Sequence, residues 1–173
     1  MPRRTSSAGR RTPGPLPQTP RDVEAVVRRC RKIVTRRALI SAGAAVVPIP
    51  GIDVAVDLGM LMKMLNEINA AFGLTPAQIE ALATRRRLTA YKAIIAIGSS
   101  YVGRIVTREL ALALVKRVAR RIVASATVKF VPLAGQALAA GLSFAAIKYI
   151  GDRHIEHCAA VANRVIDAEA RRR

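Results

Sequence analysis

Proline and glycine occur together at two places in a chain that otherwise favours helices: Val47-Pro48-Ile49-Pro50-Gly51 and Val131-Pro132-Leu133-Ala134-Gly135. Each segment should end a helix, because proline lacks a backbone donor and glycine destabilises a helix interior. Elsewhere apolar residues recur at helical spacing, as in 23–34, without the alternation typical of strands. The sequence therefore predicts an all-α fold, a bundle of about five helices built from two related helix–Pro/Gly turn–helix hairpins.

The ends of the chain differ from its middle in composition. Residues 1–19 are rich in proline and arginine and contain no acid. Such a segment buries too little apolar surface to offset its ordering entropy, so we expect a disordered basic tail. Residues 20–170 should form a single helical domain, and 171–173 a second basic tail.

Helix boundaries follow from local signals. We expect helices from Pro20 to the first Pro/Gly turn, over 52–72 with Gly73 just after the end, over 104–129 and over 136–170. Thr75, Pro76 and Gln78 predict a capped helix start, and that helix should continue into the Arg85–Arg87 run. The apolar stretch 88–103 should break near Gly98.

The two Pro/Gly segments align as parts of an internal repeat, with units of about 36–66 and 120–150. The alignment places Arg36-Arg37 over Arg120-Arg121 and Gly51 over Gly135. Chance similarity between alanine-rich helices is the alternative. Small residues four apart should allow close helix crossing in both units: Ala55 and Gly59, then Ala137, Gly141 and Ala145.

The segment Val47–Asp53, with the later Met62-Lys63-Met64-Leu65 and Phe72-Gly73-Leu74, resembles a bacterial family known as domain of unknown function family six-nine-seven. Lys129–Gly135 resembles that family's second turn, and the similarity covers about 38–150. The resemblance implies a helical domain, often predicted to be membrane-associated and often fused behind an Era/Ras-like GTPase domain. It also implies likeness to the helical domain of interferon-inducible GTPases. This chain contains no phosphate-binding Gly-x-x-x-x-Gly-Lys-[Ser/Thr] motif, so a GTPase would have to be a partner.

Few residues suggest chemistry. His154, His157 and Cys158 share a helix face near Asp152 and Glu156, which would suit a partial metal site or a Cys–His nucleophile pair. A wet helix face with one buried thiol is the favoured interpretation. Asp53 and Asp57 would suit a cation site or proton relay, but Asp53 more simply complements the positive end of its own helix. We expect no enzyme activity, no metal and no cofactor.

Charge indicates the kind of partner. The net charge of +18 should attract an anionic membrane leaflet or nucleic acid. Aromatic residues are only 3%, which disfavours base stacking. The residues expected to bind an anionic surface are Arg36, Arg37, Arg85, Arg86, Arg87, Arg120 and Arg121; the expected turn residues are Pro48, Pro50, Gly51, Asp53, Pro132 and Gly135.

Three functional hypotheses follow. The favoured one is a non-enzymatic helical protein on the cytoplasmic face of the inner membrane, binding anionic lipids with its arginine-rich helix ends all on one side. The alternatives are a soluble cytoplasmic adaptor for a GTPase or another protein, and a non-specific nucleic-acid binder. No small-molecule substrate is expected. Cys30 and Cys158 should be free thiols in a reducing cytosol; an organelle transit peptide at the arginine-rich start is disfavoured by its prolines.

Overall fold

The computed structural model describes residues 15–44, 53–98, 102–104, 106–107, 109–114, 116 and 132–172. These residues form α1 (Pro20–Ala44), α2 (Asp53–Ala71), α3 (Pro76–Glu80), α4 (Thr84–Ile97) and α6 (Pro132–Ala170), and 109–114 and 116 are also helical. The described part contains no strand, so the all-α prediction is confirmed. Pro48, Pro50 and Gly51 lie outside the described residues, as do Arg120 and Arg121, so the repeat stays a prediction.

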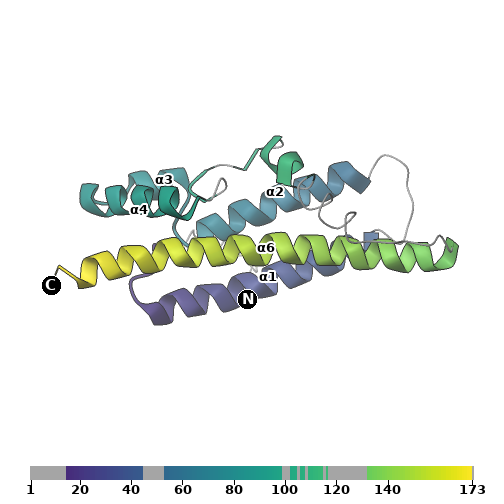
Figure 1. The fold of residues 1–173 in the computed structure, drawn as a ribbon, viewed down its shortest axis with the longest axis horizontal. Helices are drawn as coiled ribbons and strands as arrows, with labels where there is room; N and C mark the ends of the chain where they lie inside the picture. Colours follow the sequence, from purple (N-terminus) through teal and green to yellow (C-terminus); the bar gives the residue numbers. More distant parts are fainter. Residues whose placement is uncertain are drawn as a thin grey trace, which may run out of the picture.

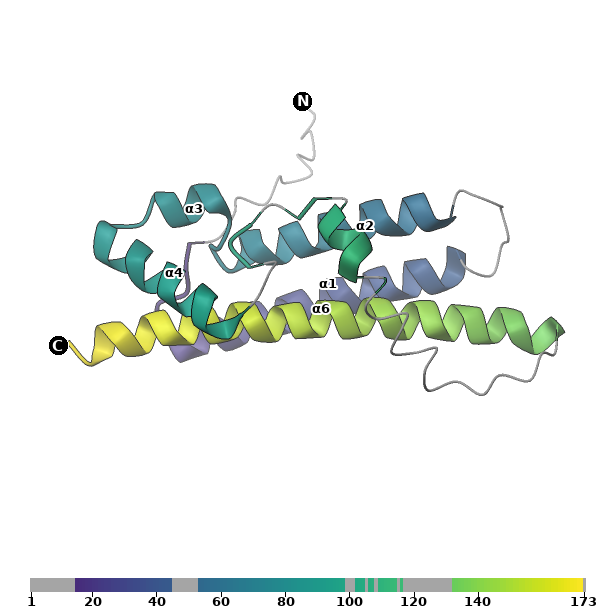
Figure 2. The same ribbon diagram turned by 45° about the horizontal axis from the view of Figure 1, so that its top comes forward.

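Three long helices form the body of the molecule (Figure 1). The 39-residue α6 would be about 58 Å long, and α1 packs along it in the opposite direction. α2 lies beside both, and the C-terminus of α1 and the N-termini of α2 and α6 lie toward the same end of the bundle. Helix α4 packs on α6 near the C-terminus, at the other end, and the short α3 packs on α4 (Figure 2).

Helices α1 and α6 pack closely at Gly151. A Cβ atom built there would lie 2.6 Å from both methyl carbons of Val34. Two turns further on, the hydroxyls of Ser41 and Ser143 are hydrogen-bonded at 2.7 Å. Gly59 and Gly141, predicted to permit close crossing, have no such neighbour within 4 Å, so that prediction is wrong for both.

Two helices begin with the same capping box. The Thr75 hydroxyl accepts from the Gln78 amide at 3.3 Å, and the Gln78 side chain accepts from the Thr75 amide at 3.1 Å, as predicted. Thr19 and Asp22 repeat this pattern at the start of α1. The hydroxyl of Thr19 is the main cause that lowers the pKa of Asp22.

The described residues begin before this cap, at Pro15. Leu16 is buried in the core, and Gly73 lies against the backbone of Pro15 and Leu16. Gly73 has φ of 69°, as expected of a residue that follows a helix C-terminus. The predicted tail 1–19 is therefore too long at its C-terminal end, because an apolar side chain at position 16 anchors the chain.

Three other boundaries also differ from the predictions. The Arg85–Arg87 run opens a separate helix, α4, since the chain turns at Ala81–Ala83. Arg104 precedes the next helical residues, which begin at 109. α6 begins at Pro132, so Pro132 and Gly135 belong to the first turn of that helix and not to a turn before it. Proline suits this position because its missing amide hydrogen has no partner in a first turn.

Candidate functional sites

A buried polar cluster joins α2, α6 and the loop that follows α4. Nε2 of His154 lies 3.0 Å from Oδ1 of Asn69, and Sγ of Cys158 lies 3.5 Å from the same oxygen. Nδ2 of Asn69 donates to the carbonyl of Arg104 at 3.2 Å. Asn66, one turn earlier on α2, accepts from the amide of Val106 at 3.0 Å. The two asparagines thus hold Arg104 and Val106 against α2.

The network fixes the protonation of His154. Because the Asn69 amide donates to a carbonyl, its oxygen faces the imidazole and Nε2 must donate. Burial, followed by the nearby His157, lowers the pKa of His154 to about 3, so the ring is neutral at physiological pH. Nδ1 is buried and has no hydrogen-bond partner among the described residues.

This geometry does not support a nucleophilic pair. Nε2, the nitrogen 3.8 Å from Sγ of Cys158, already carries the proton that it donates to Asn69. It therefore has no lone pair to accept the thiol proton, as a general base must. Burial, then the nearby Cys30, raises the pKa of Cys158 well above its ordinary value, which keeps the thiol protonated. The cluster is arranged to bind its own three segments together.

Two other polar candidates of α6, Asp152 and Glu156, take part in ion pairs. Lys148 pairs with Asp152, and Arg153 pairs with Glu156 at 3.0 Å. Within the described residues, no group of three His, Cys, Asp or Glu side chains is placed to hold a metal ion. Asp53 is the first residue of α2, and the side chains of Asp53 and Asp57 lie outside the described part.

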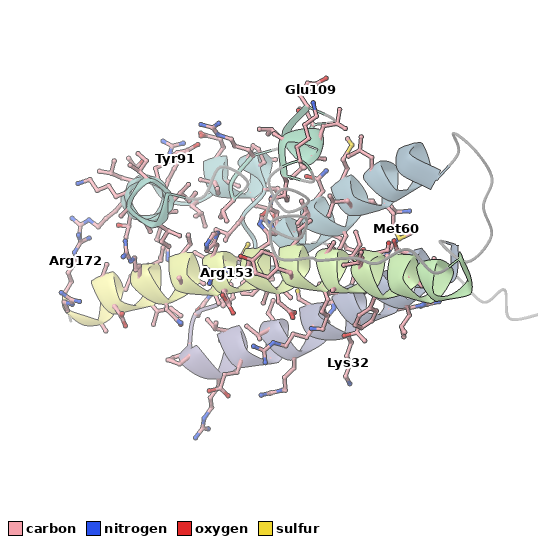
Figure 3. All side chains as sticks on the ribbon, turned by 45° about the vertical axis from the view of Figure 1, so that its right-hand side comes forward. Lys32, Met60, Tyr91, Glu109, Arg153 and Arg172 are labelled. Carbon is pink, nitrogen blue, oxygen red and sulfur yellow. The ribbon has the colours of Figure 1, made fainter. Side chains whose placement is uncertain are left out.

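The outward face of α1 carries a basic stripe, which we define as Arg21, Arg28, Arg29, Arg31, Lys32 and Arg36, all exposed. Figure 3 shows Lys32 pointing away from α6. Glu24 is the one acid that pairs with a described residue of the stripe, lying 3.6 Å from Arg28. Most of this face therefore keeps its positive charge.

Beyond Arg36 the same face becomes apolar. Leu39 lies two turns beyond Lys32, and Ile40 lies one turn beyond Arg36, so both continue the stripe. They are 60% and 49% exposed. Gly43, Gly141, Leu142 and Ala145 are also exposed, at the level along the two helices at which Ser41 contacts Ser143. We call these six residues, Leu39, Ile40, Gly43, Gly141, Leu142 and Ala145, the apolar tip.

The arginines predicted to bind an anionic surface do not gather on one side. Arg36 belongs to the basic stripe, whereas Arg37 turns toward α2 and pairs with Glu67 at 3.4 Å. Arg86 pairs with Glu169 and Arg87 with Glu80, which places the Arg85–Arg87 run at the far end of α6. The prediction of one arginine-rich side is wrong for these residues, because Arg36 and Arg37 lie beside the middle of α6, whereas Arg85–Arg87 lie near its C-terminal end.

In the part of the chain that the structure describes, no helix combines the length and apolar character needed to cross a bilayer. No family model matches the chain, and neither a curated protein nor a solved structure matches it.

Proposed function

We propose that the protein is a non-enzymatic, peripheral membrane protein that attaches to an anionic leaflet through the apolar tip, with the basic stripe directly behind it. One observation carries this proposal: on the exposed face of α1, charge gives way to apolar side chains between Arg36 and Leu39. A surface of this kind matches both layers of an anionic leaflet, headgroups and acyl chains.

The magnitudes suit reversible attachment. Basic residues near an anionic leaflet contribute about 1 kcal/mol each at low salt, and Arg36 and Lys32 lie within about 10 Å of Leu39 along α1. Leu39, Ile40 and Leu142 are already partly buried, so each adds about 1 kcal/mol on insertion. Together, the electrostatic and apolar contributions to the binding free energy resemble those of a lipid anchor combined with a polybasic patch.

The attachment is shallow. α2 begins at Asp53 at the same end of the bundle, and a carboxylate at the bilayer centre costs roughly 2.5–3.5 kcal/mol. Insertion to the boundary between headgroups and acyl chains avoids that cost. The cytoplasmic face of the inner membrane offers such a leaflet. The family resemblance adds a GTPase partner as an expectation, and no contact of the described residues bears on it.

Cosedimentation with vesicles tests the proposal. The full chain should bind vesicles with about 30% anionic lipid and not neutral vesicles, and raising the salt should weaken binding without abolishing it. Replacing Arg29, Lys32 and Arg36 with Gln should weaken binding about 100-fold at low salt, given about 1 kcal/mol per charge. Leu39→Gln with Ile40→Gln should remove the salt-resistant part.

A variant with matched charge provides the control. Replacing Arg164, Arg171 and Arg172 with Gln removes the same charge from exposed positions at the other end of α6. This variant should bind vesicles nearly as the unaltered chain does. Equal losses in both triple variants would show attraction by net charge alone. A chain that stays in the supernatant with every lipid, or a duplex DNA that displaces it from vesicles, would contradict the proposal.

A further inference from the structure

The outer face of α4 carries a second exposed apolar surface, formed by Leu88, Tyr91 and Ile95. Leu88 is 54% and Ile95 78% exposed, and the three residues follow one another at helical spacing over two turns. Ala90 and Ala93, on the opposite face, are buried against the body of the molecule. A helix that is apolar on both faces is normally covered on both.

This outer face is held rigidly. The hydroxyl of Tyr91 donates to the carboxylate of Glu80, which also pairs with Arg87 at 3.0 Å. Behind the face, Nη2 of Arg86 donates to Glu169 of α6 at 2.8 Å. Because the ring and the helix are fixed in advance, a ligand would lose little free energy in ordering them. Figure 3 shows Tyr91 directed outward from α4.

The charges around the apolar residues select the partner. Arg85 and Lys92 are exposed on one side, and within the described part neither has an ion-pair partner. Glu80, the acid beside these apolar residues, already pairs with Arg87 and accepts a hydrogen bond from Tyr91. An acidic surface would complement these cations, whereas a second copy of a chain with net charge +18 would be repelled.

We propose that Leu88, Tyr91 and Ile95, with Arg85 and Lys92, bind an acidic amphipathic helix of a protein partner. Three apolar positions over two turns match the anchor spacing by which one helix face packs on another. Tyrosine and arginine are enriched among the residues that dominate protein interfaces. Nucleic acid would leave Leu88 and Ile95 without a matching contact.

The position of α4 keeps this surface apart from the apolar tip. Arg86 pairs with Glu169, and Leu142 lies 27 residues earlier on α6, which corresponds to roughly 40 Å along the helix. Both surfaces can therefore be occupied at once. The proposal does not depend on membrane attachment, and its peptide-binding assay contains no lipid.

The probe is a labelled peptide of about 21 residues with leucines on one helical face and glutamates elsewhere, compared with a scrambled peptide of equal composition. Fluorescence anisotropy at about 150 mM salt should show binding of the amphipathic peptide at least about 10-fold tighter than that of the scrambled one. Leu88→Gln with Ile95→Gln should weaken binding about 10-fold or more. Arg85→Gln with Lys92→Gln should weaken it and reduce its salt dependence.

Leu39→Gln with Ile40→Gln is the matched control, since it removes the same kind of side chain from the opposite end and should leave peptide binding unchanged. Circular dichroism verifies that every variant is folded. Equal binding of the scrambled peptide, or full binding by the Leu88→Gln, Ile95→Gln variant, would overturn the proposal. So would a dimer that this variant makes monomeric, or loss of vesicle binding in this variant, since the occupant would then be a second copy or lipid.

Discussion

Asn69 takes part in most contacts of the buried polar cluster, although a single asparagine in a helix is an inconspicuous residue. Its side-chain oxygen accepts hydrogen bonds from His154 and Cys158 of α6, and its side-chain amide donates one to the carbonyl of Arg104. The helical spacing of His154 and Cys158 predicted that they share a face. Asn69 lies 85 positions from His154, and no local signal connects residues that far apart. The sequence therefore predicted the part of the cluster on α6, but not its partner on α2.

We expect the free energy of unfolding to depend on pH through His154. Its pKa is about 3 in the folded chain and near 6.5 in the unfolded chain, so between these values the unfolded state binds one more proton. Stability is then fully present above pH 6.5 and falls as the pH decreases, by about 2 kcal/mol between pH 7 and pH 5. Urea unfolding at the two pH values measures this difference.

His154→Gln should reduce this pH dependence while lowering stability at pH 7. His157→Gln serves as the comparison, because His157 is half-buried and burial lowers its pKa as well, with the same sign. The His157→Gln variant should retain most of the dependence. An unaltered chain with equal stability at both pH values would contradict the neutral, buried state of His154.

At the scale of the helices, Gly151 allows α1 and α6 to pack closely, because its position leaves no room for a Cβ atom. We expect Gly151→Ala to destabilise the fold by about 1–3 kcal/mol, because a Cβ would meet the branched side chain of Val34 at 2.6 Å. Gly141→Ala, in the same helix with nothing within 4 Å, should instead stabilise by about 0.5–1 kcal/mol. Thermal or urea unfolding of both variants measures the difference. If both Gly151→Ala and Gly141→Ala stabilised the fold, α1 and α6 would have to lie further apart at Gly151 than the structure shows.

Some elements were predictable because their signals are local. The box of Thr75, Pro76 and Gln78 lies within four residues, and Gly73 follows directly after α2. Thr19, Pro20 and Asp22 have the same signature and mark the start of α1 equally well. Crossing points are different, because they depend on which helices meet. Small-residue spacing favoured Gly59 and Gly141, yet the structure uses Gly151, whose partner is 117 positions away.

The break between α3 and α4 shows the same limit. Ala81, Leu82 and Ala83 contain neither glycine nor proline, and Ala83 makes no capping hydrogen bond through its side chain. Helix propensity alone would continue the helix through these residues. Contacts with α6, including Arg86–Glu169, compensate for this break. The pattern of a single segment does not show which distant residues, such as Glu169, will contact it.

At the scale of the whole molecule, α6 works as a rigid spacer between two unlike ends. The apolar tip and the basic stripe approach one end, while the outer face of α4 lies at the other (Figures 1 and 2). A membrane at the first end and a protein at the second would be held apart by most of the length of α6. The orientation of the molecule on a bilayer is therefore open to direct measurement.

Single tryptophan reporters can measure this orientation, because the chain contains no tryptophan. With Leu39→Trp, anionic vesicles should shift the emission to the blue and protect the indole from a soluble quencher. With Leu88→Trp, the same vesicles should change neither property, since Leu88 lies on α4, where Arg86 pairs with Glu169, roughly 40 Å along α6 from Leu142. Blue shifts at both positions would mean that the bundle lies flat on the membrane. A shift at position 88 alone would reverse the assignment of the two ends.

The rate at which the two native thiols react can report the opening of the bundle. Cys30 and Cys158 are both buried, and burial raises the pKa of Cys30 to about 11. At mildly alkaline pH only about 0.1% of such a thiol is ionised, so iodoacetamide reacts with the closed molecule very slowly. Alkylation then proceeds mainly through conformations in which α1 has separated from α6. The rate at which the chain gains mass in a spectrometer therefore reports how often its longest helix pair comes apart, with no mutation and no denaturant.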